Sequence, residues 1–198
     1  WVIQEGCLQQ EERVASEGRW PWVRAPRRMP EQLAQEYTLD GKVPIQDAYV
    51  DEGVTAFYKP YSAEEIERMI QEAKEGRPGP HYVATDLALH ETLSKGLPEL
   101  RGRRVLVQGS LTPWYESVAL AYGAASVTTV EYNELSWSHP KLSTTTPDKF
   151  REMWRRGEVQ PFDIVFSISS FEHDGLGRYG DPLDPEGDMR AMREVSEL

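Results

Sequence analysis

A strand, a tight turn, a helix and a second strand follow one another in residues 103–131, and this order constrains the fold more than any other part of the chain. Residues 103–108 are a short apolar run that predicts a buried strand, and residues 109–111 predict the turn. A helix is expected over 114–122, and the β-branched run 126–131 predicts the second strand. Because crossovers in such βαβ units are right-handed, the two strands should be parallel.

The following residues extend the same pattern. Residues 141–145 predict a third strand, and Thr146-Pro147 predicts the N-cap and first position of a helix, as Thr112-Pro113 does earlier. The nearly continuous apolar run 162–168 is typical of a central parallel strand that is covered on both faces. A glycine-containing loop leads to a last helix, expected from Asp184 to the final residue. We therefore expect an α/β, Rossmann-like parallel sheet in residues 101–198, truncated at its C-terminus because this helix is still running there.

The first hundred residues predict an arm and helices in front of this domain. Prolines interrupt residues 1–60, and the aromatic side chains there are scattered, so we expect a partly irregular N-terminal arm with a short helix near 30–37. Residues 61–100 predict a helical lead-in. Ser62 and Glu65 form a capping-box pattern that should start a helix running to about residue 75, and a second helix is expected over 85–95.

Charge and composition limit the partners. The formal net charge of −11 gives a field that repels phosphate backbones, so no nucleic-acid partner is expected. No apolar run is long enough for a membrane span, and the His and Cys residues show no metal-ligand spacing. The single cysteine, Cys7, allows no internal disulfide, and a cytoplasmic location is expected. The oligomeric state stays open.

The carboxyl ends of the predicted strands are the expected ligand-binding edge, because open α/β sheets bind ligands there. Gly109 stands at the strand-to-helix turn, where free N–H groups and the helix dipole favour a polar ligand. Glu131 ends the second strand, where a carboxylate can accept hydrogen bonds from both hydroxyls of a ribose. The residues expected to hold a cofactor are Gly109, Ser110, Trp114, Glu131, Asn133, Ser167 and Ser169.

The turn contains too few glycines for a dinucleotide. Only Gly109 of the fingerprint is present, and Leu111 and Pro113 stand at the later glycine positions. A pyrophosphate needs closer backbone approach than this loop offers, whereas S-adenosylmethionine has no phosphate groups. The pattern therefore favours S-adenosylmethionine over NAD or FAD. The alternative is that Gly109 makes only a tight turn and that Glu131 is a solvated strand end.

Residues after the strand at 162–168 are candidates for catalysis or substrate binding. Glu172 and His173 could contact the cofactor or serve as general base, since imidazole titrates near neutral pH. The alternative is that Glu172 caps the backbone and His173 only packs the loop. Arg178 and Tyr179 lie in a glycine-hinged loop that could close over a substrate or bind it. One of Trp114 and Tyr115 is expected in the core, His81 and His90 are expected to be structural, and His139 is expected in a turn.

Three stretches resemble a known family: Val105 to Trp114, Val127 to Asn133, and Phe166 to Leu183, the last with Ser-Phe-Glu-His-Asp-Gly-Leu-Gly-Arg-Tyr-Gly-Asp. They are similar to a domain-of-unknown-function family first described from nematode proteins, over about residues 80–198. That family in turn is similar to class I S-adenosylmethionine-dependent methyltransferases.

The resemblance implies roles for individual residues. Gly109 matches the first glycine of the methyltransferase cofactor loop, Glu131 matches the ribose-binding acid, and Glu172-His173 matches a pair found after the fourth strand. Val107 departs from the pattern, because methyltransferases usually place an acid there. The sequence thus predicts methyl transfer from S-adenosylmethionine to an oxygen or nitrogen of a small molecule or glycan. A non-catalytic binding module of the same fold and a nicotinamide-dependent enzyme are the alternatives.

Overall fold

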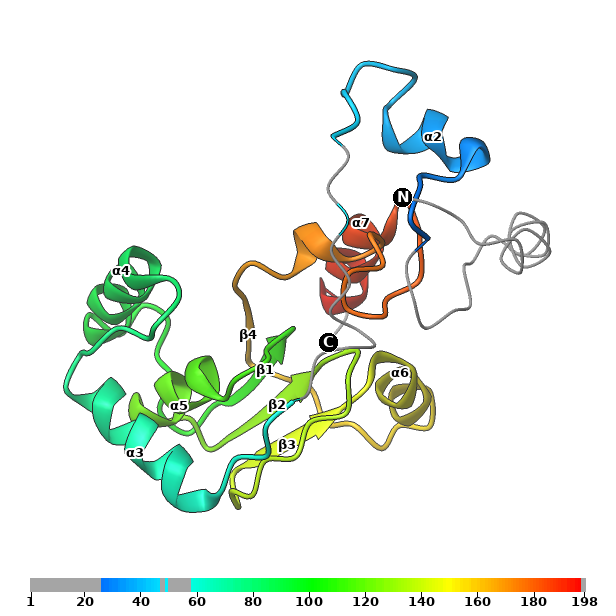
Figure 1. The fold of residues 1–198 in the computed structure, drawn as a ribbon. Helices are drawn as coiled ribbons and strands as arrows, with labels where there is room; N and C mark the ends of the chain where they lie inside the picture. Colours follow the sequence, from blue (N-terminus) through cyan, green and yellow to red (C-terminus); the bar gives the residue numbers. More distant parts are fainter. Residues whose placement is uncertain (1–25, 47–48, 50–57, 197–198) are drawn as a thin grey trace. The chain divides into compact units, whose positions relative to one another are not determined.

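The computed structural model describes residues 26–46, 49 and 58–196 (Figure 1). They form two compact units, which we describe separately. The sheet unit is Tyr58–Ser170, and the loop unit combines Phe171–Glu197 with the part of the chain before Tyr58. The arm aromatics Trp1, Trp20, Trp22 and Phe57 lie outside the described residues. No helix that the structure describes is both long and apolar enough to cross a membrane.

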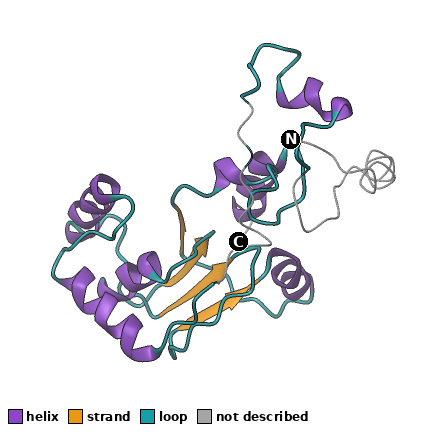
Figure 2. Cartoon of the chain, in the orientation of Figure 1, coloured by secondary structure: helices purple, strands orange, loops and turns teal. Residues whose placement is uncertain are grey.

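The sheet unit is built on four parallel strands, drawn in orange in Figure 2. Their order across the sheet is β3-β2-β1-β4, and every neighbouring pair is parallel. This confirms the predicted α/β class and a sheet consistent with a Rossmann-like fold, since the order reverses between the first strand and the fourth. The strands are β1 (Arg104–Gln108), β2 (Ser126–Val130), β3 (Leu142–Thr145) and β4 (Ile164–Ser167).

Helices cover the sheet on both sides (Figure 1). The helix α5 connects β1 to β2, whereas α6 connects β3 back to β4 in the opposite direction across the sheet. Because both crossovers are right-handed, the two helices must lie on opposite faces. The helices of this unit are α3 (Ala63–Lys74), α4 (Val83–Ser94), α5 (Trp114–Ala121) and α6 (Pro147–Arg155).

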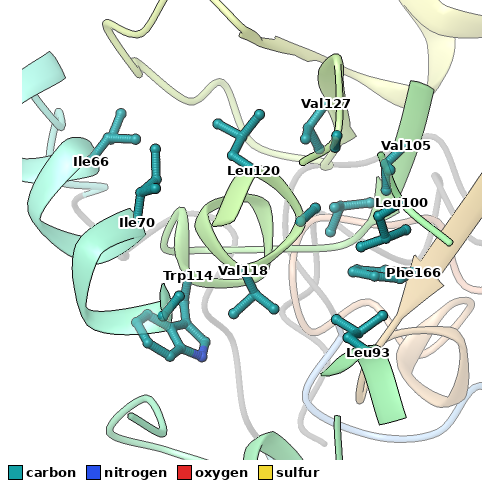
Figure 3. Packing of buried hydrophobic residues seen from close by; sticks show 14 residues of the cluster. Ile66, Ile70, Leu93, Leu100, Val105, Trp114, Val118, Leu120, Val127 and Phe166 are labelled. Carbon is teal, nitrogen blue, oxygen red and sulfur yellow. The ribbon is translucent and has the colours of Figure 1, made fainter. Parts of the chain in front are cut away.

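The core lies between the sheet and the layer formed by α3 and α5. Figure 3 shows Ile66 and Ile70 of α3 pointing toward α5. In the centre of the sheet, β1 contributes Val105 and Val107, both fully buried. Burial of a side chain of this size stabilises the fold by about 1.5–3 kcal/mol relative to exposure. This single core fixes the position of the β1–α5 turn, where the cofactor site is predicted.

The start of α3 confirms the predicted capping box. The backbone N–H of Glu65 donates to Ser62 Oγ, and the backbone N–H of Ser62 donates to Glu65 Oε2. Lys59 adds an ion pair to the Glu65 carboxylate. The lysine and the two hydrogen bonds together hold the pKa of Glu65 at about 2, well below its ordinary value.

Several predicted boundaries are corrected. The second helix begins at Val83, two positions before the expected Thr85, and Thr112 is not the N-cap of α5. Pro113 takes that position instead, and the Trp114 N–H donates to the Thr112 carbonyl at 2.7 Å. The prediction for α6 is confirmed, with Thr146 as N-cap and a proline at the first position of the helix.

The strand β4 lies at one end of the sheet that the structure describes, although its apolar run is typical of a central strand. Among the described residues it pairs with β1 alone, and of its four side chains only Phe166 is buried. The central, fully buried strand is β1, because β2 and β4 flank it on both sides.

The loop unit contains the short helix α2 (Glu31–Tyr37), the 3-10 helix η1 (Phe171–His173) and α7 (Gly187–Ser196). The predicted helix near residues 30–37 is thereby confirmed. The last helix starts at Gly187, three residues after the expected Asp184, because the intervening residues form a hydrogen-bonded turn, with the Gly187 N–H donating to the Asp184 carbonyl.

Candidate functional site

The strand register aligns the predicted cofactor residues of the sheet unit. Gln108 of β1 pairs with Val130 of β2 on one side and with Ser167 of β4 on the other. Gly109, the residue after Gln108, and Glu131, the residue after Val130, therefore lie at the same level of the sheet. The structure thus places Gly109, Glu131 and Ser167 at the carboxyl edge of the sheet, and their role in holding a cofactor stays a prediction.

Gly109 is required by its backbone and by its neighbour Ser170. Its φ of +70° lies in the left-handed region, which favours glycine. A Cβ atom at this position would overlap the Ser170 hydroxyl and lie 2.9 Å from Ser170 Cβ. The turn after β1 is therefore packed against the segment that follows β4, which accounts for the glycine before any ligand is considered.

Glu131 is buried at the end of β2, with 5 % of its surface exposed. Its Oε1 accepts hydrogen bonds from the Asn133 backbone N–H at 3.2 Å and from the Asn133 side-chain amide at 3.3 Å. Burial raises the pKa of Glu131, and these bonds, with the backbone of Ser110 and Tyr132, partly oppose the increase. Glu131 and Asn133, which are both predicted cofactor residues, are thus joined by hydrogen bonds.

Ser110 connects this edge to a carboxyl group that the sequence analysis did not single out. Glu116, in the first turn of α5, is completely buried. Its Oε1 accepts a hydrogen bond from Thr129 Oγ1 at 2.7 Å, and its Oε2 lies 3.3 Å from Ser110 Oγ. Burial raises the pKa of Glu116 to about 7, against the opposing effect of these hydroxyl groups. The only hint of this buried acid in the sequence was a single charged residue in a mostly apolar helix.

Trp114 belongs to the core of the sheet unit. Its side chain is buried among the core residues (Figure 3). Its indole N–H donates to Asp86 Oδ2 at 3.0 Å. The same carboxylate accepts from the Tyr115 hydroxyl and from the Gly79 backbone N–H. Of the two aromatic residues, Trp114 is therefore the core residue, and its burial does not favour the predicted contact with a cofactor. Asp86 is itself buried, and these three hydrogen bonds explain its burial by a structural role.

The serines after β4 differ in their surroundings. Ser167 is half-buried within the strand, whereas Ser169 is exposed. Ser169 has a φ of +52°, which is uncommon for a residue with a side chain. Such a conformation costs of order 1 kcal/mol or more and is found preferentially at functional sites. The strained residue lies on the segment that packs on the Gly109 turn.

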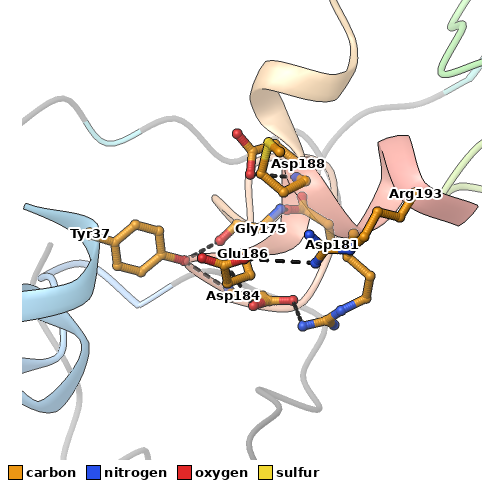
Figure 4. A network of polar contacts seen from close by, with 9 residues as sticks. Tyr37, Gly175, Asp181, Asp184, Glu186, Asp188 and Arg193 are labelled. Atoms are coloured by element: carbon orange, nitrogen blue, oxygen red, sulfur yellow. Dashed lines mark hydrogen bonds and ion pairs between the residues drawn. The ribbon is translucent and has the colours of Figure 1, made fainter. Parts of the chain in front are cut away.

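In the loop unit, Asp181 organises the glycine-containing segment (Figure 4). Its buried carboxylate accepts backbone N–H bonds from Gly175 at 2.9 Å, Gly177 at 2.8 Å and Tyr179 at 3.0 Å. Gly175 has a φ of +92°, and a Cβ atom there would overlap the Asp184 carbonyl oxygen. One carboxylate therefore holds together, by hydrogen bonds, the segment that was predicted to be a lid.

Tyr37 of α2 is hydrogen-bonded to the backbone of the same segment. Its hydroxyl donates to the Gly175 carbonyl oxygen and accepts from the Asp184 backbone N–H. Burial raises the pKa of this phenol above its ordinary value. A residue distant in sequence thus anchors both ends of the loop.

The predicted catalytic and lid residues are neighbours within the loop unit. The His173 and Tyr179 rings are edge-to-face with centroids 5.6 Å apart, and the Arg178 guanidinium lies 4.8 Å from the centre of the Tyr179 ring. Glu172 is exposed in η1. His173, Arg178 and Tyr179 therefore form one row of side chains, while the chemical roles given to them remain predictions.

Two other histidines have structural partners. The ring nitrogens of His90 contact the Arg77 carbonyl oxygen and the Tyr122 hydroxyl, as expected for a structural histidine. His139 is buried, and its Nδ1 accepts from the Lys141 N–H, so Nε2 donates to Glu67. No group of three or more His, Cys, Asp or Glu side chains in the described ranges could hold a metal ion.

Comparison with known proteins gives a match at the level of a family. The model of the family described as "Caenorhabditis protein of unknown function, DUF268" matches residues 102–197, from the start of β1 to the end of α7. No curated protein matches the chain. The match confirms the resemblance to a nematode family of unknown function over residues 102–197.

Proposed function

We propose that the carboxyl edge of the sheet unit binds S-adenosylmethionine and that the domain is methyltransferase-like, transferring a methyl group to an oxygen or nitrogen of a small molecule or glycan. The observation that carries the proposal is the position of the Glu131 carboxylate. It lies level with the Gly109 turn across the paired strands β1 and β2. A carboxylate at this position beside the β1 turn suits the ribose of a nucleoside.

The residues present fit such a nucleoside. Both hydrogen bonds from Asn133 end on Oε1 of Glu131, and a carboxylate has about four acceptor sites in total. The backbone of Ser110 and Tyr132 also hydrogen-bonds this carboxylate, and its remaining acceptor capacity would serve the ribose hydroxyls. The turn has one glycine, and Pro113 is buried at the start of α5, which supports a ligand without a pyrophosphate over a dinucleotide.

The chemistry asks little of the chain beyond positioning. The sulfonium group of S-adenosylmethionine supplies an already activated methyl group, so approach geometry dominates the barrier. Glu131 and Ser110 would hold the nucleoside, and Ser167 and Ser169 would contribute polar groups at the same edge. In this proposal the proton of the methyl acceptor passes to solvent, and no obligatory general base is required.

Ligand-induced stabilisation tests the proposal directly. We expect 1 mM S-adenosylhomocysteine to raise the melting temperature of the chain, because a ligand that binds only the folded state stabilises it by mass action. Glu131→Gln should abolish this shift, since the amide keeps the shape of the side chain but loses one acceptor oxygen and the charge. Glu134→Gln is the matched control, because Glu134 lies on the same segment with 78 % of its side chain exposed.

The alternatives give different outcomes in the same assay. A shift with NAD and none with S-adenosylhomocysteine would select a nicotinamide-dependent enzyme. A shift with S-adenosylhomocysteine, combined with no methyl transfer from radiolabelled S-adenosylmethionine to any pool of small molecules or glycans, would select the non-catalytic module. No shift with either ligand would contradict the nucleoside site itself.

A further inference from the structure

The fully buried carboxyl group of Glu116 connects the interior of the sheet unit to the turn after β1. Glu116 belongs to α5, Thr129 to β2 and Ser110 to the turn itself, so three elements meet at one side chain. Thr129 is buried as completely as Glu116, and Ser110 is also buried. The described residues provide no lysine or arginine ion pair to this carboxyl group. An acid with only hydroxyl partners in such a place needs a physical explanation.

The hydrogen-bond geometry at Ser110 indicates where the proton of Glu116 lies. Ser110 Oγ is 2.8 Å from the Thr112 carbonyl oxygen and 3.3 Å from Glu116 Oε2. A hydroxyl group has one proton to donate, and a carbonyl oxygen can only accept. The shorter bond therefore takes the serine proton. The remaining contact is satisfied when Glu116 is protonated and donates to Ser110 Oγ.

The surroundings favour this neutral form. The side chains of α3 and β1 in the same core are apolar, including Ile66, Ile70 and Val107. The titratable neighbours are Tyr115, whose pKa is raised mainly by burial, Asp86, which binds Tyr115, and Glu131, which interacts with the Ser110 backbone. Each of these groups is neutral or negative, so none favours a second negative charge.

We propose that Glu116 is a positioning residue of the ligand-binding edge: as a neutral acid it donates to Ser110 and thereby fixes the Ser110–Thr112 hydrogen bond that shapes the β1–α5 turn. The chain of donors runs from Glu116 through Ser110 to the Thr112 carbonyl, which also accepts the Trp114 N–H. Ionisation of Glu116 removes the first donor and attracts the serine proton away from Thr112. The effect on a ligand rests on the proposed function, whereas the effect on the turn does not.

The direction of the pH effect follows from the burial. The pKa of Glu116 is raised from 4.5 to about 7 in the folded chain. A carboxyl group with a raised pKa contributes stability that is fully present below its unfolded pKa and is lost as the pH rises through the folded pKa. Wild-type stability attributable to this group should therefore decline between about pH 4.5 and about pH 7. The turn should rearrange near the upper end of that window.

Unfolding measurements without ligand test the protonation. We expect the unfolding free energy of the whole chain to fall over this pH window and Glu116→Gln to remove that slope, because the amide donates to Ser110 at every pH. The control is Glu91→Gln, which neutralises an acid whose side chain is 69 % exposed. Thr129→Val, which removes a hydroxyl that lowers the pKa, should move the loss to higher pH if Glu116→Gln folds poorly. Equal slopes in wild type, Glu116→Gln and Thr129→Val would overturn the proposal.

The backbone amide of Trp114 tests the connection to the turn, because it donates to the Thr112 carbonyl. Its NMR chemical shift should follow the titration of Glu116 in the wild-type chain and lose most of its amplitude in Ser110→Ala. Undiminished amplitude in Ser110→Ala would show that the shift reflects only the nearby charge, and it would overturn the relay.

The last measurement uses S-adenosylhomocysteine. Its Kd should increase by about tenfold between pH 6 and pH 8.5 in the wild type, the equivalent of one hydrogen bond, and stay constant in Glu116→Gln. A pH-independent Kd in both proteins would overturn the role at the ligand edge. If the ligand binds neither protein at either pH, the proposed function fails, and the unfolding and NMR measurements still decide whether Glu116 positions the turn.

Discussion

Asn133 donates two hydrogen bonds, one from its backbone and one from its side chain, to the same oxygen of Glu131. Asn133 thus holds the carboxylate at the end of β2 through one oxygen, and the backbone of Ser110 and Tyr132 adds further hydrogen bonds to the same carboxylate. Burial opposes the charge that these bonds support, and the balance leaves the pKa of Glu131 above its ordinary value. Asn133 thus contributes to both the orientation and the charge of the candidate ribose-binding group.

Asn133→Ala should raise the pKa of Glu131 further, because the lost side-chain bond favours the charged form. A carboxyl group with a raised folded pKa loses its stabilising contribution as the pH rises. We therefore expect Asn133→Ala to cost about 1 kcal/mol at pH 8 and less at pH 5, measured by urea unfolding. Asn133→Asp, which places a second negative charge beside Glu131, should have a larger effect of the same sign. A cost that is independent of pH would contradict this account.

Gly109→Ala should destabilise the chain through two separable effects. The left-handed backbone costs about 1–2 kcal/mol for a residue with a Cβ atom, and the overlap with Ser170 adds about 1–3 kcal/mol. Gly157→Ala is the matched control, because Gly157 has nearly the same φ, +69°, and no atom within 4 Å of the added Cβ. In Gly109→Ala/Ser170→Gly the second cost should disappear and the first remain. Equal stability of the Gly109→Ala and Gly157→Ala chains would show that Ser170 yields freely.

The sequence predicted the elements that depend on local patterns. The strand, turn, helix and strand of residues 103–131 and the capping box at Ser62 are defined by side chains close together in the chain, and the structure confirms them. The parallel order followed because right-handed crossovers leave few arrangements. The alignment of Gly109 with Glu131 is a consequence of that order and needed no further information.

Features that depend on contacts between distant residues could not be predicted from local sequence patterns. The burial of Glu116 requires Thr129 and Ser110 to close over it, and the core position of Trp114 requires Asp86 from α4. Each of these outcomes is decided by tertiary packing, to which local propensity and pattern are insensitive.

Asp86→Ala should strongly destabilise the sheet unit. The buried carboxylate accepts from the Trp114 indole, the Tyr115 hydroxyl and the Gly79 backbone, and its removal leaves these donors without a partner. We expect a loss of about 3–5 kcal/mol in unfolding free energy and a smaller loss for Asp86→Asn, which keeps one acceptor oxygen. Asp148→Ala is the control, because the Asp148 side chain is 90 % exposed, and it should change stability by less than about 0.5 kcal/mol. A similarly small loss for Asp86→Ala would show that water replaces the carboxylate.

The capping box should make α3 sensitive to acid. Lys59 and the Ser62 backbone hold the pKa of Glu65 at about 2, below its ordinary value of 4.5. A depressed folded pKa means that the contribution to stability is present above the unfolded pKa and is lost as the pH falls from about 4.5 toward about 2. Melting curves between pH 7 and pH 2.5 should therefore converge for wild type and Glu65→Gln at the acid end and differ at neutral pH. Ser62→Ala, which removes the other half of the box, should cost about 1 kcal/mol at neutral pH. Parallel curves for wild type and Glu65→Gln over the whole range would mean that solvent and salt already screen the Glu65 charge.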